Sequence, residues 1–437
     1  MDLRTEVIEW IADDPDSVTA AQLQHWLDTN NEAELRTSFS GFLQFGTAGL
    51  RGPVRPGPSG MNRAVVGRTA AAIAAYMKER GLTSVVIGRD ARHGSEDFTF
   101  ETAQIMSGAG MKVYILPRAL PTPVLAFATN ELKCDVGIMV TASHNPPQDN
   151  GYKVYLGGTV DGIHYRGSQI VSPTDESIAS HIDAVKKLAL QPRSDQWEIV
   201  SEDIVEKYVS TTAAIATKPG DLKIVYTAMH GVGTETLLRV FHKAGFVSPI
   251  LVDAQAHPDP DFPTVVFPNP EEPGAIDLAL ETARAFAADL VIANDPDADR
   301  CAAAVNDPTI GWRMLRGDEL GAILGEIIAR NSTHGILANS IVSSTILSKI
   351  ATHYNLQFKQ TLTGFKWLAK IDGLTFGYEE ALGYAVDAIT VNDKDGISAA
   401  IKLAQIATDL ASEGKTLLDL LDEIWARHGF HATEQIS

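Results

Sequence analysis

Val136-Gly137-Ile138-Met139-Val140, followed by Thr141-Ala142-Ser143-His144-Asn145-Pro146, indicates most clearly how this chain folds. The five apolar residues form a run short enough for a buried strand. Asn145-Pro146-Pro147 disfavours a helix beyond the loop, because proline restricts the residue before it. The segment therefore predicts Ser143 on a stiff turn at a strand end, where α/β sheets place their chemistry. The loop lacks G-x-S-x-G, which disfavours a hydrolase triad, and an ordinary hydroxyl-rich turn is the alternative.

A second apolar run, Asp289-Leu290-Val291-Ile292-Ala293, leads into Asn294-Asp295-Pro296-Asp297-Ala298-Asp299-Arg300. Three alternating carboxylates on a bent loop can converge on one hard cation. A calcium EF-hand loop also begins D-x-D-x-D, but here Arg300 and Asn306 replace its glycine and its final glutamate. Three carboxylates leave positions for a phosphate oxygen or water, which is typical of Mg²⁺ in phosphoryl transfer. The loop predicts a metal site, and a solvated acidic turn is the alternative.

Together the two loops resemble those of the α-D-phosphohexomutase superfamily, the phosphoglucomutases and phosphomannomutases. Further segments resemble the motifs of this family and follow its order along the chain. They are Phe45-Gly46-Thr47-Ala48-Gly49-Leu50-Arg51-Gly52, Thr363-Gly364-Phe365-Lys366-Trp367, Gly377-Tyr378-Glu379-Glu380-Ala381-Leu382-Gly383-Tyr384 and Lys394-Asp395-Gly396. Within the superfamily, the loops in the last third are most similar to the branch of bacterial α-phosphoglucomutases and the vertebrate glucose/pentose phosphomutase.

The resemblance implies an α/β fold with three consecutive similar α/β domains, whose mixed, largely parallel sheets surround a shared cleft. We expect an N-terminal domain with the phosphoserine loop at 1–205, a metal-binding domain at 206–315 and a sugar-binding domain at 316–434. The sequence pattern agrees with this α/β fold. Apolar runs at 84–88, 112–116 and 222–226 predict strands, and the pattern at 317–324 predicts a helix. Residues 1–35 are acidic and helix-prone, which predicts an N-terminal extension.

The family has a fourth, C-terminal domain that we expect to be absent here. In the family, an Arg-Ser-Gly-Thr-Glu-Pro type of loop in that domain clamps the non-reacting phosphate of the substrate. The sequence contains no such motif and ends at Gly429-Phe430-His431-Ala432-Thr433-Glu434-Gln435-Ile436-Ser437. We therefore expect impaired mutase activity from this chain, since remote binding energy normally holds the substrate in its reactive geometry.

The implied function is that of a phosphosugar mutase, an isomerase that acts as an intramolecular phosphotransferase. It would move a phosphoryl group between the 1- and 6-positions of a hexose phosphate, with glucose 1-phosphate and glucose 6-phosphate as the expected pair. Phospho-Ser143 would carry the group, and a hexose 1,6-bisphosphate would be the intermediate and activator. Phosphomannomutase and phosphopentomutase activities remain alternatives. A truncated, non-catalytic phosphosugar-binding protein is an alternative of another class.

The resemblance also assigns roles to individual residues. The catalytic positions are Ser143, Lys153, Arg51, His144 and Lys394. The ligands of Mg²⁺ are Ser143, through its phosphate, with Asp295, Asp297 and Asp299. The substrate-binding positions are Arg300, Glu379, Glu380, Thr363 and Gly364.

The chemistry of these side chains narrows some of the roles. An arginine stays protonated in proteins, so Arg51 is expected to position rather than to take a proton. A lysine near other cations can lose its proton readily enough to act as a base, which suits Lys153 or Lys394. His144 can equally shape the loop or take part in catalysis. Arg300 suits a bidentate phosphate contact, and the two glutamates suit sugar hydroxyls or a solvated helix start.

Composition and charge exclude several classes of function. The chain has 437 residues, of which 45% are hydrophobic and 21% charged, as in globular proteins. Its net charge of −19 argues against nucleic acid and anionic membranes as partners, so an anionic sugar phosphate must rely on local cations. Only Cys134 and Cys301 are present, and the N-terminus is polar, which favours a reducing cytoplasm. We expect a monomer or a weak homodimer.

Overall fold

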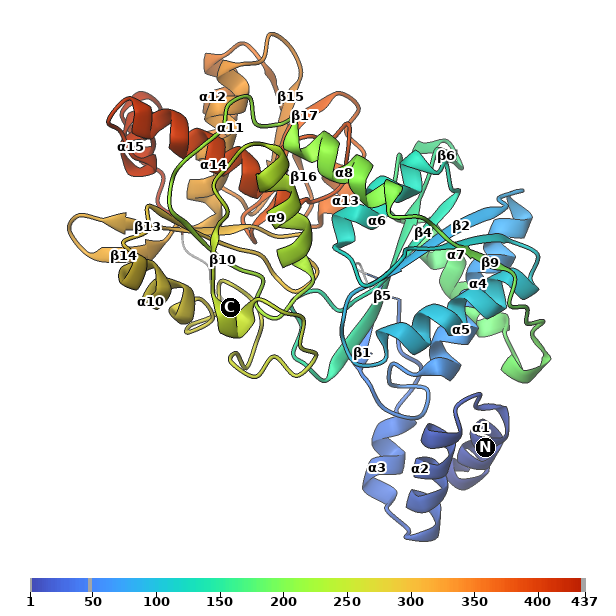
Figure 1. The fold of residues 1–437 in the computed structure, drawn as a ribbon. Helices are drawn as coiled ribbons and strands as arrows, with labels where there is room; N and C mark the ends of the chain where they lie inside the picture. Colours follow the sequence, from blue (N-terminus) through green and yellow to red (C-terminus); the bar gives the residue numbers. More distant parts are fainter. Residues whose placement is uncertain (1, 46–48, 434–437) are drawn as a thin grey trace. The chain divides into compact units, whose positions relative to one another are not determined.

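The computed structural model describes residues 2–45 and 49–433, which fall into two compact units. Unit 1 is Met1–Ala119 with Ala128–Glu202, and unit 2 is Leu120–Phe127 with Asp203–Ser437 (Figure 1). Gly46, Thr47 and Ala48 of the N-terminal signature, and Glu434 at the end of the third predicted domain, lie outside the described residues. The predicted domain boundaries stay a prediction.

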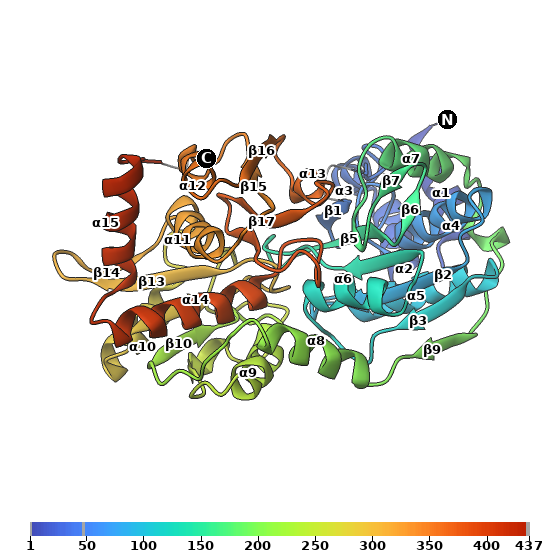
Figure 2. The same cartoon turned by 90° about the horizontal axis from the view of Figure 1, so that it is seen from above.

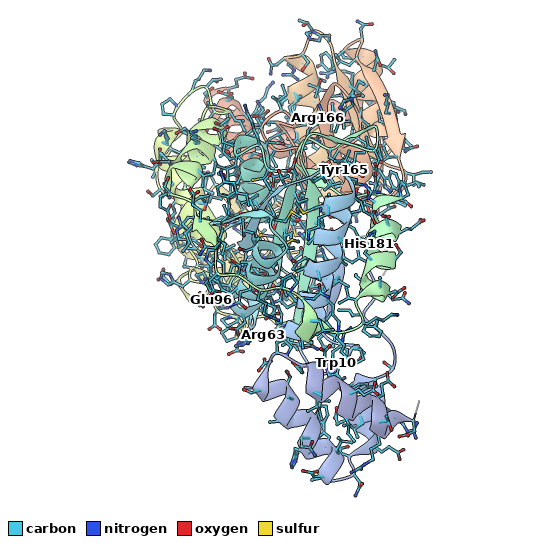
Figure 3. The ribbon with its side chains drawn as sticks, turned by 90° about the vertical axis from the view of Figure 1, so that its right-hand side faces the viewer. Trp10, Arg63, Glu96, Tyr165, Arg166 and His181 are labelled. Carbon is cyan, nitrogen blue, oxygen red and sulfur yellow. The ribbon has the colours of Figure 1, made fainter. Side chains whose placement is uncertain are left out.

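Three short helices open unit 1, in agreement with the helix-prone extension expected from the sequence. They are α1 (Leu3–Asp13), α2 (Ser17–Asp28) and α3 (Glu32–Ser38). Each begins at an Asp or Asn side chain that accepts a main-chain N–H of the first turn. Trp10 lies where these helices meet the rest of unit 1 (Figure 3). Nearby, Arg68 of α4 (Arg63–Glu79) pairs with Asp13 at 2.6 Å and lies 5.1 Å from the Trp10 ring, and these contacts attach the extension to the rest of unit 1.

The sheet of unit 1 has a parallel half and an antiparallel half. Its strand order is β1-β5-β4-β2-β3-β9, with β8 paired to β5. β4 is parallel to β2, and β5 is antiparallel to both β4 and β1. Every residue of β4 is buried, as expected for a strand covered on both faces. The strands are β1 (Leu50–Pro53), β2 (Ser84–Arg89), β3 (Lys112–Ile115), β4 (Val136–Val140), β5 (Asp149–Leu156), β6 (Thr159–Val160), β7 (Ile163–His164), β8 (Ser168–Gln169) and β9 (Trp197–Ile199).

Helices cover this sheet. α5 packs on β2 and β3, and the largely buried, alanine-rich α4 packs against α5 and α7 (Figure 1). The helices are α4 (Arg63–Glu79), α5 (Ser95–Gly108), α7 (Thr174–Ala184) and the 3₁₀ turn η1 (Leu188–Leu190). A further helix, α6 (Thr122–Glu131), starts within the segment assigned to unit 2 and ends in unit 1.

Unit 2 begins, after the Leu120–Phe127 segment, with α8 and a five-stranded sheet of order β11-β10-β12-β13-β14. β10 is parallel to β11 and β12, whereas β13 runs antiparallel to β12. The strands are β10 (Ile224–Thr227), β11 (Ile250–Leu251), β12 (Leu290–Ala293), β13 (Ala302–Asp307) and β14 (Gly311–Met314). The helices are α8 (Asp203–Ala213), α9 (Gly233–Lys243), η2 (Asp253–Gln255) and α10 (Asp277–Phe286).

The second sheet of unit 2 has four strands in the order β16-β15-β17-β18. β15 is parallel to β16 and β17, and β18 is antiparallel to β17. α14 packs against α8, α9 and β18 and so joins the two halves of the unit (Figure 2). The elements are α11 (Gly317–Arg330), β15 (Ile336–Ser340), α12 (Ile346–His353), β16 (Gln357–Thr361), α13 (Phe365–Leu368), β17 (Leu374–Glu379), β18 (Gly383–Ala385), α14 (Gly396–Ser412) and α15 (Leu417–His428).

All three large sheets therefore share one plan, in which parallel strands are followed by an antiparallel strand. This confirms the predicted fold class of three similar α/β units with mixed sheets. Within residues 2–45 and 49–433, no helix combines the length and the apolar character needed to cross a membrane.

Candidate functional site

Each large sheet carries one of the predicted functional loops at the same place, between its last parallel strand and the antiparallel strand that follows. The loops are β4–β5, β12–β13 and β17–β18. In each loop one residue other than glycine has a left-handed backbone: Ser143 at φ 55°, Ala298 at 54° and Leu382 at 63°. Such a backbone costs on the order of 1–3 kcal/mol and persists only where its surroundings enforce it. Three equivalent strained turns thus carry Ser143, the three aspartates and, next to the third turn, Glu379 and Glu380.

A buried ion pair, Asp90 and Arg92, stabilises the Ser143 turn through hydrogen bonds. Asp90 accepts the Thr141 hydroxyl at 2.6 Å, and the oxygen of that hydroxyl accepts the Ser143 N–H at 2.9 Å. The Arg92 guanidinium donates to the main-chain carbonyls of Ser143, Asn145, Pro146 and Asp149. Burial raises the pKa of Asp90, and the nearby Arg92 opposes that shift. The pair shapes the loop without belonging to the predicted set.

The sheet of unit 1 brings Arg51 and Lys153 to neighbouring strands. Arg51 on β1 lies opposite Gly151 on β5, and Lys153 is two residues further on, so both belong to the same face. A Cβ at Gly151 would lie 2.5 Å from the Thr141 carbonyl oxygen and 3.0 Å from the Arg51 Cγ, so this close packing requires a glycine. Lys153 is buried, with 1% of its surface exposed. His144 Nδ1 lies 3.2 Å from the Ser143 hydroxyl, which is compatible with either of its two expected roles.

The three carboxylates of the β12–β13 loop converge as predicted. Asp295, Asp297 and Asp299 are buried, and each can offer an oxygen within 4.8 Å of the others. Main-chain bonds set this shape, since the Ala298 N–H donates to the Asp295 carbonyl and the Arg300 N–H to the Asp295 side chain. The group could hold a metal ion.

The electrostatics of this loop agree with a cation site. Burial, followed by the charges of Asp297 and Asp299, raises the pKa of Asp295 to about 8. Buried like charges repel one another, and a divalent cation bound by their oxygens would relieve the repulsion. Three carboxylates with no soft ligand suit a hard cation such as Mg²⁺. The donor set therefore fits the metal expected from the sequence.

Lys394 lies beside the carboxylates, with its Nζ 3.2 Å from the Asp299 Oδ2. Burial alone would lower the pKa of Lys394, but Asp299, Asp393 and Glu379 outweigh it and hold that pKa above its usual value. In this arrangement the lysine is a cation paired with Asp299. The loop that presents it is anchored by Asp395, which accepts the Tyr208 hydroxyl at 2.9 Å and two N–H groups of α14.

The loops of unit 2 are hydrogen-bonded to one another. The Cys301 N–H donates to the Leu382 carbonyl at 3.0 Å, and the Gly396 N–H donates to the Ala298 carbonyl at 3.2 Å. Gly396 must be glycine for this approach, since a Cβ there would lie 2.2 Å from the Arg300 carbonyl oxygen. Arg300 also forms an isolated β-bridge with Gly383. The β12–β13 loop, the β17–β18 loop and the segment Lys394-Asp395-Gly396 thus form one assembly.

Glu379 and Glu380, at the β17–β18 loop, have different surroundings. Glu379 is the last residue of β17 and Glu380 follows it, so neither lies at a helix start. Glu379 is buried and accepts the Gly364 N–H at 2.7 Å, which brings the Thr363-Gly364 turn next to it. Burial raises the pKa of Glu379, and Lys394 opposes that shift. Glu380 accepts the hydroxyls of Ser340 and Ser343 through one oxygen, at 2.9 and 2.7 Å.

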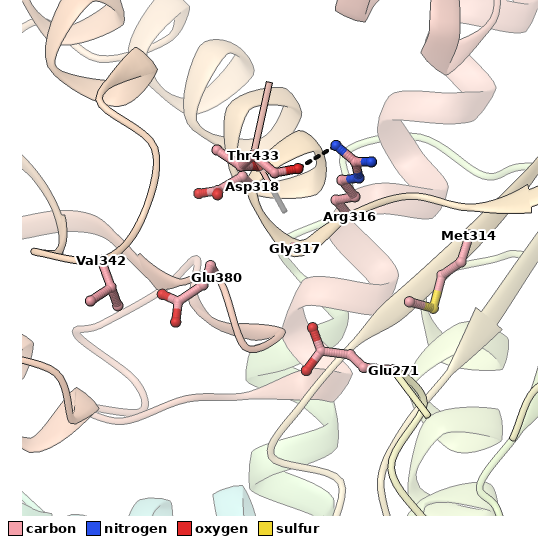
Figure 4. Close-up of a pocket in the computed structure, with 8 residues that line it drawn as sticks. All are labelled: Glu271, Met314, Arg316, Gly317, Asp318, Val342, Glu380 and Thr433. Atoms are coloured by element: carbon pink, nitrogen blue, oxygen red, sulfur yellow. Dashed lines mark hydrogen bonds between the residues drawn. The ribbon is translucent and has the colours of Figure 1, made fainter. Parts of the chain in front are cut away.

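Glu380 also lines a cavity of about 400 Å³ in unit 2, which the sequence did not indicate (Figure 4). Glu271 faces the same cavity, and burial raises its pKa to about 7. Arg316 borders the cavity and donates to the Thr433 carbonyl. The other lining residues are Met314, Gly317, Asp318 and Val342.

Several supporting residues were missed from the sequence, namely Asp90, Arg92, Thr122, Tyr208 and Glu271. Asp90 and Arg92 lie within four residues of the end of the predicted strand at 84–88, a position that could have signalled a role at the strand end. Pro121-Thr122-Pro123 is a local signal for a helix start. Tyr208 and Glu271 stand in no motif, so only the fold reveals them.

The chain is similar to family models and to solved structures of known proteins. The chain matches three domain models described as phosphoglucomutase/phosphomannomutase, alpha/beta/alpha domains I, II and III. The matched residues are 43–188, 203–311 and 316–428. Among solved structures, a phosphoglucomutase/phosphomannomutase family protein from Burkholderia thailandensis has a TM-score of 0.72 at 21% identity, covering 86% of this chain and 78% of that chain. That similarity shows the fold.

Curated relatives are similar over most of their length. The "Probable phosphomannomutase" of Haemophilus influenzae is 50% identical over 86% of this chain and 78% of its own. The phosphopentomutase of Mus musculus is 35% identical over 99% of this chain and 75% of its own length. The phosphoglucomutase of Staphylococcus haemolyticus is 34% identical over 98% of this chain and 79% of its own length. The matches cover well over half of the chain, so it belongs to the phosphoglucomutase/phosphomannomutase family of the α-D-phosphohexomutase superfamily.

Proposed function

We propose that this chain is a phosphosugar mutase that interconverts glucose 1-phosphate and glucose 6-phosphate through phospho-Ser143. Members of its family are phosphomutases, which supports the reaction class. The observation that carries the proposal is the set of three equivalent strand-end turns. They present a serine hydroxyl, a buried triple carboxylate and the buried carboxylate of Glu379. A protein that only bound sugar phosphates would need neither the serine nor the triple carboxylate.

In the proposed reaction, an oxygen of the sugar monophosphate attacks the phosphorus of phospho-Ser143. The bond between phosphorus and the Ser143 oxygen breaks, and a new phosphate ester forms on the sugar. The proton of the attacking hydroxyl passes to a base, and the released Ser143 oxygen gains a proton. The hexose 1,6-bisphosphate then turns around and returns its other phosphoryl group to Ser143. The net result is an isomerisation with no phosphate lost.

Residues of unit 1 have distinct parts in this proposal. Lys153, a buried lysine on β5, is the candidate base, and Arg51 on the neighbouring strand positions phosphate oxygens because it cannot lose its proton. His144 orients the Ser143 hydroxyl, which lies 3.2 Å from its Nδ1. The Asp90–Arg92 pair keeps the turn in its strained form.

In unit 2, Asp295, Asp297 and Asp299 would hold Mg²⁺. When bound, the cation neutralises charge that develops on the transferring group. Arg300 contributes a guanidinium suited to two phosphate oxygens. Lys394 stays a cation beside Asp299 and so favours anion binding. These local positive charges counter the overall charge of −19.

Sugar recognition falls to Glu379 and its neighbours. A buried carboxylate accepts hydrogen bonds from two hydroxyls and so reads their orientation. The Thr363-Gly364 turn, bonded to Glu379, would contact the same sugar. Glu380 has one oxygen engaged by Ser340 and Ser343 and keeps the other for a hydroxyl.

A substrate panel tests the proposal. The rates of isomerisation of glucose 1-phosphate, mannose 1-phosphate and ribose 1-phosphate are compared with Mg²⁺ and a hexose 1,6-bisphosphate present. We expect the highest kcat/KM for glucose 1-phosphate and no turnover by Ser143→Ala. A preference for mannose or ribose would support the activities for which two relatives are named. Binding of sugar phosphates with no turnover and no phosphate on Ser143 would favour the non-catalytic alternative.

A further inference from the structure

The segment Leu120–Phe127 belongs to the same compact unit as the triple carboxylate, although the chain on either side of it belongs to unit 1. Its third residue, Thr122, is the first residue of α6 and is flanked by Pro121 and Pro123. Neither sequence motif nor family resemblance singled out this residue.

Thr122 makes two hydrogen bonds to a single residue, Asp297. Its hydroxyl donates to the Asp297 Oδ2 at 2.6 Å, and its main-chain N–H donates to the Asp297 carbonyl at 2.9 Å. Both residues have 0% of their surface exposed, so water does not compete for these bonds. Thr122 thus holds both the main chain and the side-chain carboxylate of Asp297.

The hydroxyl bond has a direct consequence for a cation at this loop. A hydroxyl has one proton to donate, and in Thr122 that proton is committed to the Asp297 carboxylate. A carboxylate with one oxygen held in this way has a fixed orientation. Metal ligands need such outer contacts, and their removal typically lowers metal affinity about 10–100-fold.

We propose that Thr122 is a positioning residue of the metal site, acting through the orientation of Asp297. The inference rests on the proposed function in one respect, that the three aspartates bind Mg²⁺. The two hydrogen bonds have different roles. The main-chain bond keeps the segment Leu120–Phe127 in place, and the hydroxyl bond fixes the orientation of the Asp297 carboxylate.

The substitution Thr122→Val separates these contributions, because valine has nearly the shape of threonine and keeps the main-chain N–H. Thr122→Ser keeps the hydroxyl and should restore the contact. Thr236→Val is the matched control, since Thr236 is a fully buried threonine of unit 2 on α9 whose hydroxyl has no hydrogen-bond partner among the described residues. The affinity for Mg²⁺ is measured by isothermal titration calorimetry on the whole chain, and the affinity for Mn²⁺ is measured in parallel.

We expect Thr122→Val to weaken Mg²⁺ binding about 10–100-fold. Thr122→Ser, which keeps the hydroxyl, and Thr236→Val, which removes no hydrogen bond to the carboxylates, should both stay within about threefold of the wild type. Equal Mg²⁺ affinity in Thr122→Val and the wild type would overturn the inference while leaving the metal site intact. Absence of Mg²⁺ binding by the wild type would remove the metal site itself, and the inference with it.

A second measurement applies if Thr122→Val does not fold. Because Thr122 is bonded to a ligand, saturating Mg²⁺ should slow amide hydrogen exchange in the segment Leu120–Phe127 of the wild type. Exchange in α15, which lies in the same unit, should change much less. Unaltered exchange in Leu120–Phe127, at Mg²⁺ concentrations that calorimetry shows to saturate the site, would overturn the inference without any variant.

Discussion

Arg92→Met removes the guanidinium that holds the Ser143 turn. Two of its nitrogens donate to four carbonyls at distances from 2.5 to 3.1 Å, and the side chain is 1% exposed. Adding the four bonds separately would overestimate the loss, since the loop can relax in part. Removing one partner of a buried ion pair costs about 3–5 kcal/mol, because the remaining charge, here Asp90, is left buried. We take this range as the expected loss of stability of unit 1.

Differential scanning calorimetry measures the effect. For a unit of this size, each kcal/mol of lost stability lowers the Tm by about 2–4 °C. A loss of about 3–5 kcal/mol should therefore lower the Tm of the variant by about 6–20 °C. The control is Arg89→Met, three residues earlier in the chain, whose arginine pairs with Glu96 at the surface. Exposed pairs contribute about 0–1 kcal/mol, so this control should lose at most about 4 °C.

A second measurement separates the effect of Arg92→Met on the Ser143 loop from its effect on the stability of unit 1. At a temperature where Arg92→Met is still folded, phosphorylation of Ser143 by a hexose bisphosphate should be slower than in Arg89→Met, because the turn is no longer held in its strained form. If the two variants melt at the same temperature and are labelled at the same rate, the role assigned to the buried pair is wrong.

Three further predictions concern unit 2. Burial raises the pKa of Glu271 to about 7, above its usual 4.5, so its stabilising contribution is complete below pH 4.5 and is lost as the pH rises through 7. Glu271→Gln should therefore flatten the fall of Tm over that range, and an unchanged slope would contradict this. A Cβ at position 231 would lie 2.3 Å from the Pro296 Cα, so Gly231→Ala should displace the metal loop and weaken Mg²⁺ binding; an unaltered affinity would refute this. Mg²⁺ at about 100 times its Kd should stabilise the wild type by about 2.7 kcal/mol, and Asp297→Asn should lose most of that gain; an equal rise of Tm in both would argue against the carboxylates as ligands.

The sequence predicted the parts of the site that are local in the chain. Ser143 follows its strand within three residues, and the three aspartates alternate on one loop, so spacing alone indicated their convergence. The strands at 84–88, 112–116 and 222–226 and the helix at 317–324 followed from apolar patterns in the same way. These features depend on short-range geometry that the order of residues determines directly.

The contacts that hold the loops could not be predicted in this way, because they join distant parts of the chain. Thr122 reaches Asp297 across 175 positions, and Tyr208 reaches Asp395 across 187. No periodic pattern encodes such pairs. Lys394 illustrates the same point, since its motif indicated a cation, and only the fold shows that Asp299 is its partner.

The central claim is that Ser143 carries the phosphoryl group, and phosphopeptide mass spectrometry tests it most directly. The chain is incubated with a hexose 1,6-bisphosphate and Mg²⁺ and then digested and sequenced by fragmentation. We predict one phosphoryl group, located on Ser143, which is absent in Ser143→Ala and strongly reduced in Asp297→Asn. Phosphate on a different residue, or equal labelling of Ser143→Ala and the wild type, would contradict the account.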